Sequence, residues 1–210
     1  MVRCGSVNRG SPVSMMATQK PLRVRDPERP AKILAAAARL FAAQGFHPVS
    51  LADIGSEAGI VGSGVYRHFD NKLAVLVALL DEALAQLIGN TEKVLASDLP
   101  ADEVLAQLVR TQVEFCIDQR LAVQLYRTEL TALDEEDARR LRRLQRRYNE
   151  EWVSALLEVR SDLTETSARV LVFSAIGAIQ STVMYDSGLA REDQIALVAS
   201  IAMRCLATEV

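Results

Sequence analysis

Arg67 is the side chain of this sequence best suited to reading a nucleic-acid base. A guanidinium group can donate two hydrogen bonds to guanine or bind a backbone phosphate, and the pattern leaves both roles open. Val65 and Phe69 have the spacing of residues on the buried face of a short helix. The outward positions of that helix are then Gly62, Ser63, Tyr66 and Arg67. Such a helix would have to enter the major groove, and Gly62 would let its backbone approach closely.

The residues before Arg67 predict the support that such a helix needs. Ser50 and Asp53 have the spacing of a capping box, in which each side chain accepts a hydrogen bond from the other residue's backbone amide. A short helix over 51–58 follows and ends at Gly59, and a second short helix is expected over 62–69. Two short helices joined at a glycine are typical of a helix-turn-helix.

The rest of the chain predicts more helices and no strand. Half of the 210 residues are hydrophobic but only 5% are aromatic, a balance that favours helix–helix packing. Helical periodicity predicts an all-α fold with a three-helix N-terminal part and a larger helical domain. The expected helices, besides the two short ones, cover 28–44, 72–95, 102–118, 121–130, 134–159, 165–185 and 191–208.

Charge is distributed unevenly along the chain. Residues 1–75 hold ten basic and five acidic side chains, whereas 76–210 hold 14 basic and 22 acidic ones. This split predicts a small basic unit followed by an acidic body. Residues 1–27 have no periodicity and five basic side chains, so they are read either as a flexible tail or as an arm that touches DNA.

The residues of enzyme and metal sites are scarce. The chain has two histidines, His47 and His68, and lacks nucleophile-elbow, P-loop and dinucleotide-binding motifs. Cys4, Cys116 and Cys205 are too scattered for a metal site or a disulfide framework. We therefore expect no catalytic residues, no metal and no cofactor.

No membrane segment is expected from the sequence. The longest uninterrupted apolar run, 73–80, is much shorter than the roughly 18 residues of a spanning helix. The first twenty residues have no apolar stretch of signal-peptide length. The sequence therefore predicts a cytoplasmic protein without a membrane partner.

The stretch from Ser50 to Lys72 reads SLADIGSEAGIVGSGVYRHFDNK and resembles the DNA-binding domain of TetR-type transcriptional regulators. The matching positions are Ser50, Asp53, Ile54, Ala58, Gly59, Ile60, Val65, Tyr66, His68, Phe69 and Lys72, preceded by Phe41, Gly45 and Phe46. The form of this stretch, with Tyr148, Trp152 and Val153 later, looks like a subgroup common in actinobacteria. Val61 stands where many members place a capping Ser, which should weaken the second helix by about 1 kcal/mol.

The resemblance implies three parts: a basic arm (1–27), a helix-turn-helix domain (28–72) and a ligand-binding and dimerisation domain (73–210). It implies phosphate contacts from Tyr66, His68 and Lys72, and Ser50 could add another. Packing is the alternative role for Tyr66 and His68. A homodimer would place two such helices about one DNA turn apart on a palindrome.

The implied dimer surface is the last two long helices, about 164–185 and 190–208. Small residues there permit close approach of helices, although they could equally serve packing within the chain: Ala175, Gly177, Ala178 and Ser181.

The resemblance also implies a small-molecule effector whose binding releases a repressor from DNA. Polar groups within apolar helices are the candidate ligand-binding residues: Gln107, Thr111, Tyr126, Arg127, Trp152, Phe173 and Gln180.

A dense basic run lies at residues 139–147 and is read either as a solvated helix face or as a site for a phosphate-bearing effector such as an acyl-CoA. The alternative function is a ligand-binding or protein-interaction module whose helix-turn-helix no longer binds DNA.

Overall fold

The computed structural model describes residues 28–60 and 62–209, together with Met1. Over these residues the chain forms eight α-helices and three short 3-10 helices without a strand, so the expected all-α class is confirmed. The basic arm, including Cys4, and the departure at Val61 lie outside the described residues.

The N-terminal unit (residues 29–71) contains α1 (Arg29–Gln44), α2 (Leu51–Glu57) and the 3-10 helix η1 (Gly62–Arg67). Pro30 stands in the first turn of α1, where its missing amide hydrogen costs nothing. Gly45 ends α1 with a φ of 81°, a value that favours glycine.

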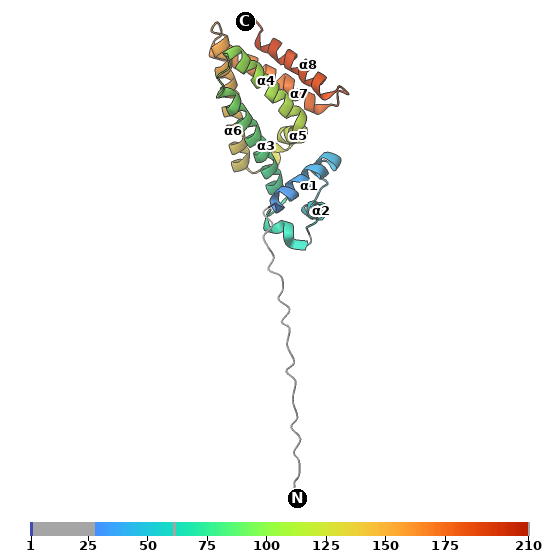
Figure 1. Cartoon of the computed structure of the whole chain (residues 1–210). Coiled ribbons are helices and arrows are strands. Elements are labelled where there is room, and N and C mark those ends of the chain that lie inside the picture. The colour runs from blue at the N-terminus through green and yellow to red at the C-terminus, as the bar shows by residue number, and fades with distance from the viewer. Residues whose placement is uncertain (2–27, 61, 210) are drawn as a thin grey trace.

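Helix α3 (Lys72–Leu95) connects this unit to the rest of the chain. The side chain of Asn71 accepts a hydrogen bond from the Ala74 amide and caps the helix. Helix α3 packs against α1 near its start and against α4, α5 and α6 farther along (Figure 1). Any change in the tilt of α3 therefore moves the N-terminal unit.

The helical body (residues 101–206) contains α4 (Ala101–Asp118), α5 (Arg120–Glu129), α6 (Glu135–Val159), α7 (Glu165–Ser181) and α8 (Arg191–Leu206). Two 3-10 turns, η2 (Leu130–Ala132) and η3 (Thr182–Met184), follow α5 and α7. The predicted helix 165–185 thus ends in a 3-10 turn. Helices α7 and α8 pack side by side across α4, and α6 covers the other edge of α4 and α7 (Figure 1).

Two hydrophobic cores hold these helices together. The larger core joins the second half of α3 to α4, α6, α7 and α8. The smaller core lies under α1, α2 and η1, and it also includes Leu125 of α5 and Leu141 of α6. The N-terminal unit therefore packs directly on helices of the body, which gives a physical path between the two.

By length and hydropathy alone, Lys72–Leu95 and Glu165–Met184 are apolar enough to cross a membrane. This differs from the expectation based on uninterrupted apolar runs. Both segments contribute buried residues to the larger core, and core helices pass the same composition test.

Candidate nucleic-acid interface and effector cavity

The capping box at the start of α2 has the predicted geometry. The Asp53 amide donates to Ser50 Oγ over 3.1 Å, and Asp53 Oδ2 accepts from the Ser50 amide over 2.9 Å. The Ser50 hydroxyl also donates to Asp53 Oδ2 over 2.6 Å. These hydrogen bonds lower the pKa of Asp53, because they favour its ionised form. Ser50 thus positions α2, and its hydroxyl is exposed at the start of the helix.

The second short helix, expected over 62–69, ends two residues earlier. Its residues form the 3-10 helix η1, with Gly62 and Ser63 in its first turn. Gly64 explains how the tighter helix fits, since a Cβ there would lie 2.5 Å from Ile60 Cγ2. The preceding turn depends on Gly59, whose φ of 67° favours glycine.

Three side chains of this segment reach solvent together. Val65 is buried and Phe69 is half-buried, which fixes the inward face of η1. Tyr66 is 54% exposed, and Arg67 and His68 are exposed beside it. Arg67 has no ion-pair partner among the described residues, so its guanidinium is available to a phosphate or a guanine. The packing role weighed for Tyr66 and His68 does not account for this exposure.

Lys72 is held by the protein itself. Its Nζ donates to the backbone carbonyls of Phe46 and His47 over 2.8 and 2.9 Å, and it lies 4.4 Å from the centroid of the Phe46 ring. The ammonium group thereby joins the start of α3 to the α1–α2 loop. An ammonium carries three donors, so one hydrogen is left for a phosphate.

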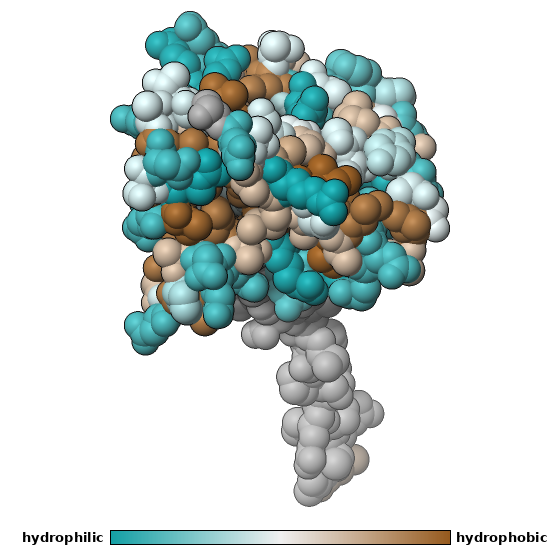
Figure 2. Space-filling model, turned by 90° about the horizontal axis from the view of Figure 1, so that it is seen from above, coloured by the Kyte–Doolittle hydropathy of each residue, from teal (hydrophilic) through white to brown (hydrophobic). Residues whose placement is uncertain are grey.

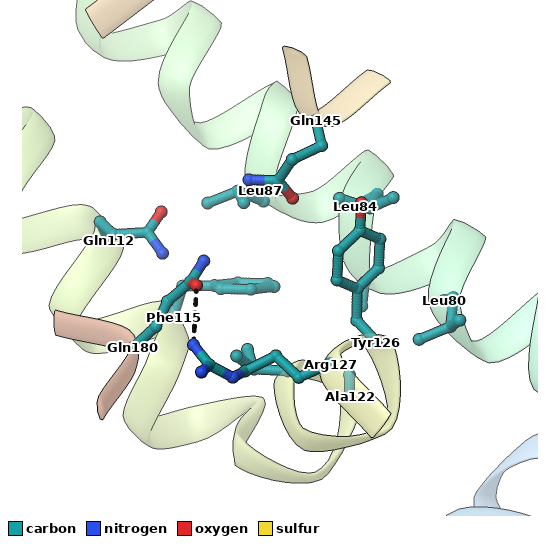
Figure 3. A pocket seen from close by; sticks show the side chains of 12 residues that line it. Leu80, Leu84, Leu87, Gln112, Phe115, Ala122, Tyr126, Arg127, Gln145 and Gln180 are labelled. Atoms are coloured by element: carbon teal, nitrogen blue, oxygen red, sulfur yellow. Dashed lines mark hydrogen bonds between the residues drawn. The ribbon is translucent and has the colours of Figure 1, made fainter. Parts of the chain in front are cut away.

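A cavity lies in the body between α3, α4 and α5, with single residues of α6 and α7 at its margin (Figure 3). Its wall is apolar along α3, at Leu80, Leu84 and Leu87, and polar at three of the predicted ligand residues, Tyr126, Arg127 and Gln180. Arg127 Nη1 lies 3.4 Å from Gln180 Oε1. As it stands the cavity has a volume of about 30 Å³, space for a single water, so a larger molecule must displace side chains.

The other four predicted ligand residues do not line this cavity. Gln107 is exposed on α4 and Thr111 is half-buried beside it. Phe173 is 50% exposed on the outer face of α7. Trp152 is fully buried in the larger core, and its indole nitrogen has no hydrogen-bond partner among the described residues.

Sequence reasoning missed Gln112 and Gln145, which line the cavity from α4 and α6. Gln112 follows Leu105 and Leu108 on the buried stripe of α4, whereas Gln107 lies five residues earlier on the solvent side. The signal in the sequence that identifies Gln112 is a polar residue at a position of the buried stripe.

Gln112 belongs to a buried polar chain. The Tyr148 hydroxyl donates to Gln112 Oε1, and Gln112 Nε2 donates to Cys116 Sγ over 3.2 Å. Burial raises the pKa of Cys116 to about 12 and raises that of Tyr148 well above its usual value. Both groups therefore stay protonated and hold the amide of Gln112 in place.

Two polar contacts join the N-terminal unit and α3 to the helices of the body. Arg140 of α6 donates to both carboxylate oxygens of Asp81 on α3, and also to Asp137 over 2.9 Å. His47 of the α1–α2 loop lies 3.2 Å from the carboxylate of Glu129 at the end of α5.

Comparison with known families accounts for this pairing of a helix-turn-helix with a cavity. The model of the bacterial regulatory proteins of the tetR family matches residues 33–79, and that of the tetracyclin repressor-like C-terminal domain matches 98–200. The chain belongs to the TetR family. The matched families are families of transcriptional regulators.

Among relatives of this TetR-family chain, the repressor KstR2 of Rhodococcus jostii (strain RHA1) is 32% identical over 129 residues, 61% of this chain and 63% of that protein. A TetR-family regulator from Bordetella parapertussis has a crystal structure with a TM-score of 0.74 and 25% identity, covering 85% of this chain and 95% of that one. FadR of Bacillus subtilis in complex with stearoyl-CoA has a TM-score of 0.69 and 22% identity, covering 86% and 99%.

Proposed function

We propose that this TetR-family chain is a cytoplasmic, ligand-responsive transcriptional repressor that binds a palindromic operator. The observation that carries this proposal is the exposed trio Tyr66, Arg67 and His68 on a glycine-dependent helix-turn-helix. DNA-binding residues are then Ser50, Gly62, Ser63, Tyr66, Arg67, His68 and Lys72, within a unit of about 28–72.

Capture of sheared genomic DNA tests this function directly. The wild type should enrich a few palindromic sites, and Tyr66→Ala/Arg67→Ala should lose them, because base contacts contribute about 1–3 kcal/mol each. Arg139→Ala, which removes an exposed arginine of α6, is the matched control and should bind as the wild type does. Folding of each variant is checked by circular dichroism. Equal enrichment by wild type and double variant would favour the interaction-module alternative.

A homodimer through α7 and α8 is part of this proposal. The outer faces of these helices expose four large apolar side chains to solvent: Val170, Phe173, Leu197 and Ile201. An exposed group of this kind is typical of an interaction surface. Apolar patches also stand out between polar side chains in the view of Figure 2. Of the four small residues, Gly177 and Ser181 are exposed, Ala178 is half-buried and Ala175 packs inside the chain.

Phe173→Asp tests that surface, because a buried carboxylate would destabilise an apolar interface. Analytical ultracentrifugation should show a dimer for the wild type and a monomer for Phe173→Asp. Gln107→Asp is the control, because Gln107 is an exposed residue of α4, and this variant should remain dimeric. A monomeric wild type at micromolar concentration would contradict the proposed interface.

The effector proposed for the inner cavity is an anionic amphiphile, with an acyl-CoA as the candidate. Arg127 and Tyr126 mark its polar end, and Arg142 lies close enough to oppose the rise that burial causes in the pKa of Tyr126. Arg142, Arg143 and Arg146 are exposed on α6 without an ion-pair partner among the described residues. The stearoyl-CoA complex of FadR supports the same class.

Calorimetry with CoA, acetyl-CoA and palmitoyl-CoA tests this class of effector. Palmitoyl-CoA should bind and release operator DNA, while Arg142→Gln/Arg146→Gln should weaken it about tenfold or more. Arg204→Gln is the control: it removes an exposed arginine of α8, outside the basic run, and should bind palmitoyl-CoA as the wild type does. Absence of heat with all three compounds at high micromolar concentration would exclude acyl-CoA as the effector.

A further inference from the structure

A second, roomier cavity lies outside the site already described. It is a groove of about 350 Å³ between α1, α3 and the junction of α4 and α5. That volume falls within the range of ligand-binding pockets, about 300–1,000 Å³. The floor is apolar, with a row of small residues on α1 facing leucines of α3 and α5: Ala31, Leu34, Ala35, Ala38, Leu79, Leu121 and Leu125.

The rim of this groove has one uncompensated charge. Asp118 is neutralised by Arg191, whose Nε and Nη2 lie 3.0 and 2.8 Å from its two oxygens. Gln119 Nε2 donates to Gln86 Oε1 over 3.0 Å. Glu82 is exposed on α3 and has no ion-pair partner among the described residues. An occupant with a positive group would therefore be favoured and one with a negative group disfavoured.

We infer that this groove is a second ligand-binding site, which takes a compact apolar molecule with an ammonium group. The apolar body would cover the alanines of α1 and the leucines of α3 and α5, and the ammonium would face Glu82. This charge preference is opposite to that of the inner cavity, where Arg127 lines the wall. Two chemically different molecules could thus bind to the same chain.

The position of the groove gives its occupant an influence on the N-terminal unit. Its walls come from α1 on one side and from α3 and α5 on the other, and Leu125 belongs to the core shared by these helices. Ala83 and Ala122 line both the groove and the inner cavity. A molecule in the groove therefore contacts both the unit that carries η1 and the wall of the cavity.

Binding of octylammonium, octanol and octanoate, followed by backbone amide chemical shifts, tests the inference on the full chain without DNA. Octylammonium should shift the amides of Ala35 and Ala38, and octanoate should not. Glu82→Gln should weaken octylammonium about fivefold and leave octanol unchanged, since an exposed charge pair contributes little more. Ala35→Leu should reduce binding of both by filling the groove.

Matched controls distinguish binding at this groove from binding in the inner cavity and from nonspecific binding. Glu158→Gln removes an exposed carboxylate of α6 and Ala106→Leu enlarges an exposed residue of α4, and neither should change octylammonium binding. Leucine is compatible with a helix, so both leucine variants should fold. The inference is overturned if octylammonium leaves the α1 amides unmoved at millimolar concentration, or if Glu82→Gln leaves the preference for ammonium over alcohol intact.

Discussion

The N-terminal unit exposes the polar side chains of its candidate site to solvent. The helical body, in contrast, buries a set of hydrogen-bonded polar side chains. Around η1, Tyr66, Arg67 and His68 point to solvent over a small apolar core. In the body, Tyr148 and Gln112 are buried at 2% and 1% exposure and hydrogen-bonded to each other. An outward set can meet a large partner such as DNA, whereas an inward set can only meet a molecule that enters. The variants that follow test this contrast.

The reactivity of Cys116 gives the largest expected effect. Burial raises its pKa from 9.0 to about 12, so at pH 8 its thiolate fraction falls about a thousandfold. In a Cys4→Ser/Cys205→Ser variant, a thiol reagent should therefore react only when denaturant is added. Rapid reaction of the folded chain would show that the buried polar chain is open to solvent.

The same thiol predicts a pH dependence of stability. Its pKa is higher in the folded chain than in the unfolded chain, so the unfolded chain loses the proton first. The contribution of this thiol to the free energy of unfolding should then be constant below pH 9 and decrease from about pH 9 to about pH 12. Cys116→Ala should decrease less steeply over that range in denaturant titrations.

Removal of one hydroxyl group from each region compares them directly. Tyr148→Phe leaves Gln112 Oε1 without its buried donor and should lower the free energy of unfolding by about 2 kcal/mol. Tyr66→Phe removes an exposed hydroxyl and should leave stability unchanged while weakening operator binding. Denaturant unfolding and DNA-binding isotherms measure the two quantities. Equal losses of stability in the two variants would contradict the contrast between the buried and the exposed polar side chains.

Lys72 lies between the two cases, because its ammonium is both partly exposed and hydrogen-bonded to backbone. Lys72→Ala should reduce stability by about 1.5 kcal/mol, since it leaves two carbonyls without a charged donor. Operator affinity should fall as well. Arg67→Ala should reduce only the affinity. Unchanged stability in Lys72→Ala would mean that its carbonyl contacts contribute nothing and that phosphate is its main partner.

The smallest effect is expected for the ion pair between α3 and α6. Arg140 and Asp81 are each about a third exposed, at 36% and 38%, so solvent screens them. Arg140→Ala should cost about 1 kcal/mol. The neighbouring Arg139→Ala breaks a more exposed pair with Glu135 and should change stability by less than about 0.5 kcal/mol. Identical results for both variants would mean that the α3–α6 contact adds no stability.

Features that depend on a few neighbouring residues were predicted well from sequence. The capping box of Ser50 and Asp53 and the turn at Gly59 are local chemistry, and the structure has both. The short helix at η1 was expected but its 3-10 form was not, because the close approach of Gly64 to Ile60 depends on how the turn folds back.

The cavity was predicted only in part for a similar reason. Tyr126 and Arg127 line the cavity from α5 and Gln180 lines it from the end of α7, and all three had been named as polar groups beside apolar residues. Phe173 lies away from the cavity because α7 buries Ala168, Val172, Ala175 and Ile179, a stripe that leaves 173 on the outer face. Which stripe faces which helix is settled by packing between distant segments, and a single sequence does not contain that information.

Ala83 and Ala122 separate the inner cavity from the groove under α1. Each contributes a single methyl group, the smallest side chain that still forms a wall. A glycine at either position would thin the wall between the two spaces, and a leucine would fill part of them. The range of molecules that this regulator recognises can therefore change in evolution by one codon, without alteration of the helices that read DNA.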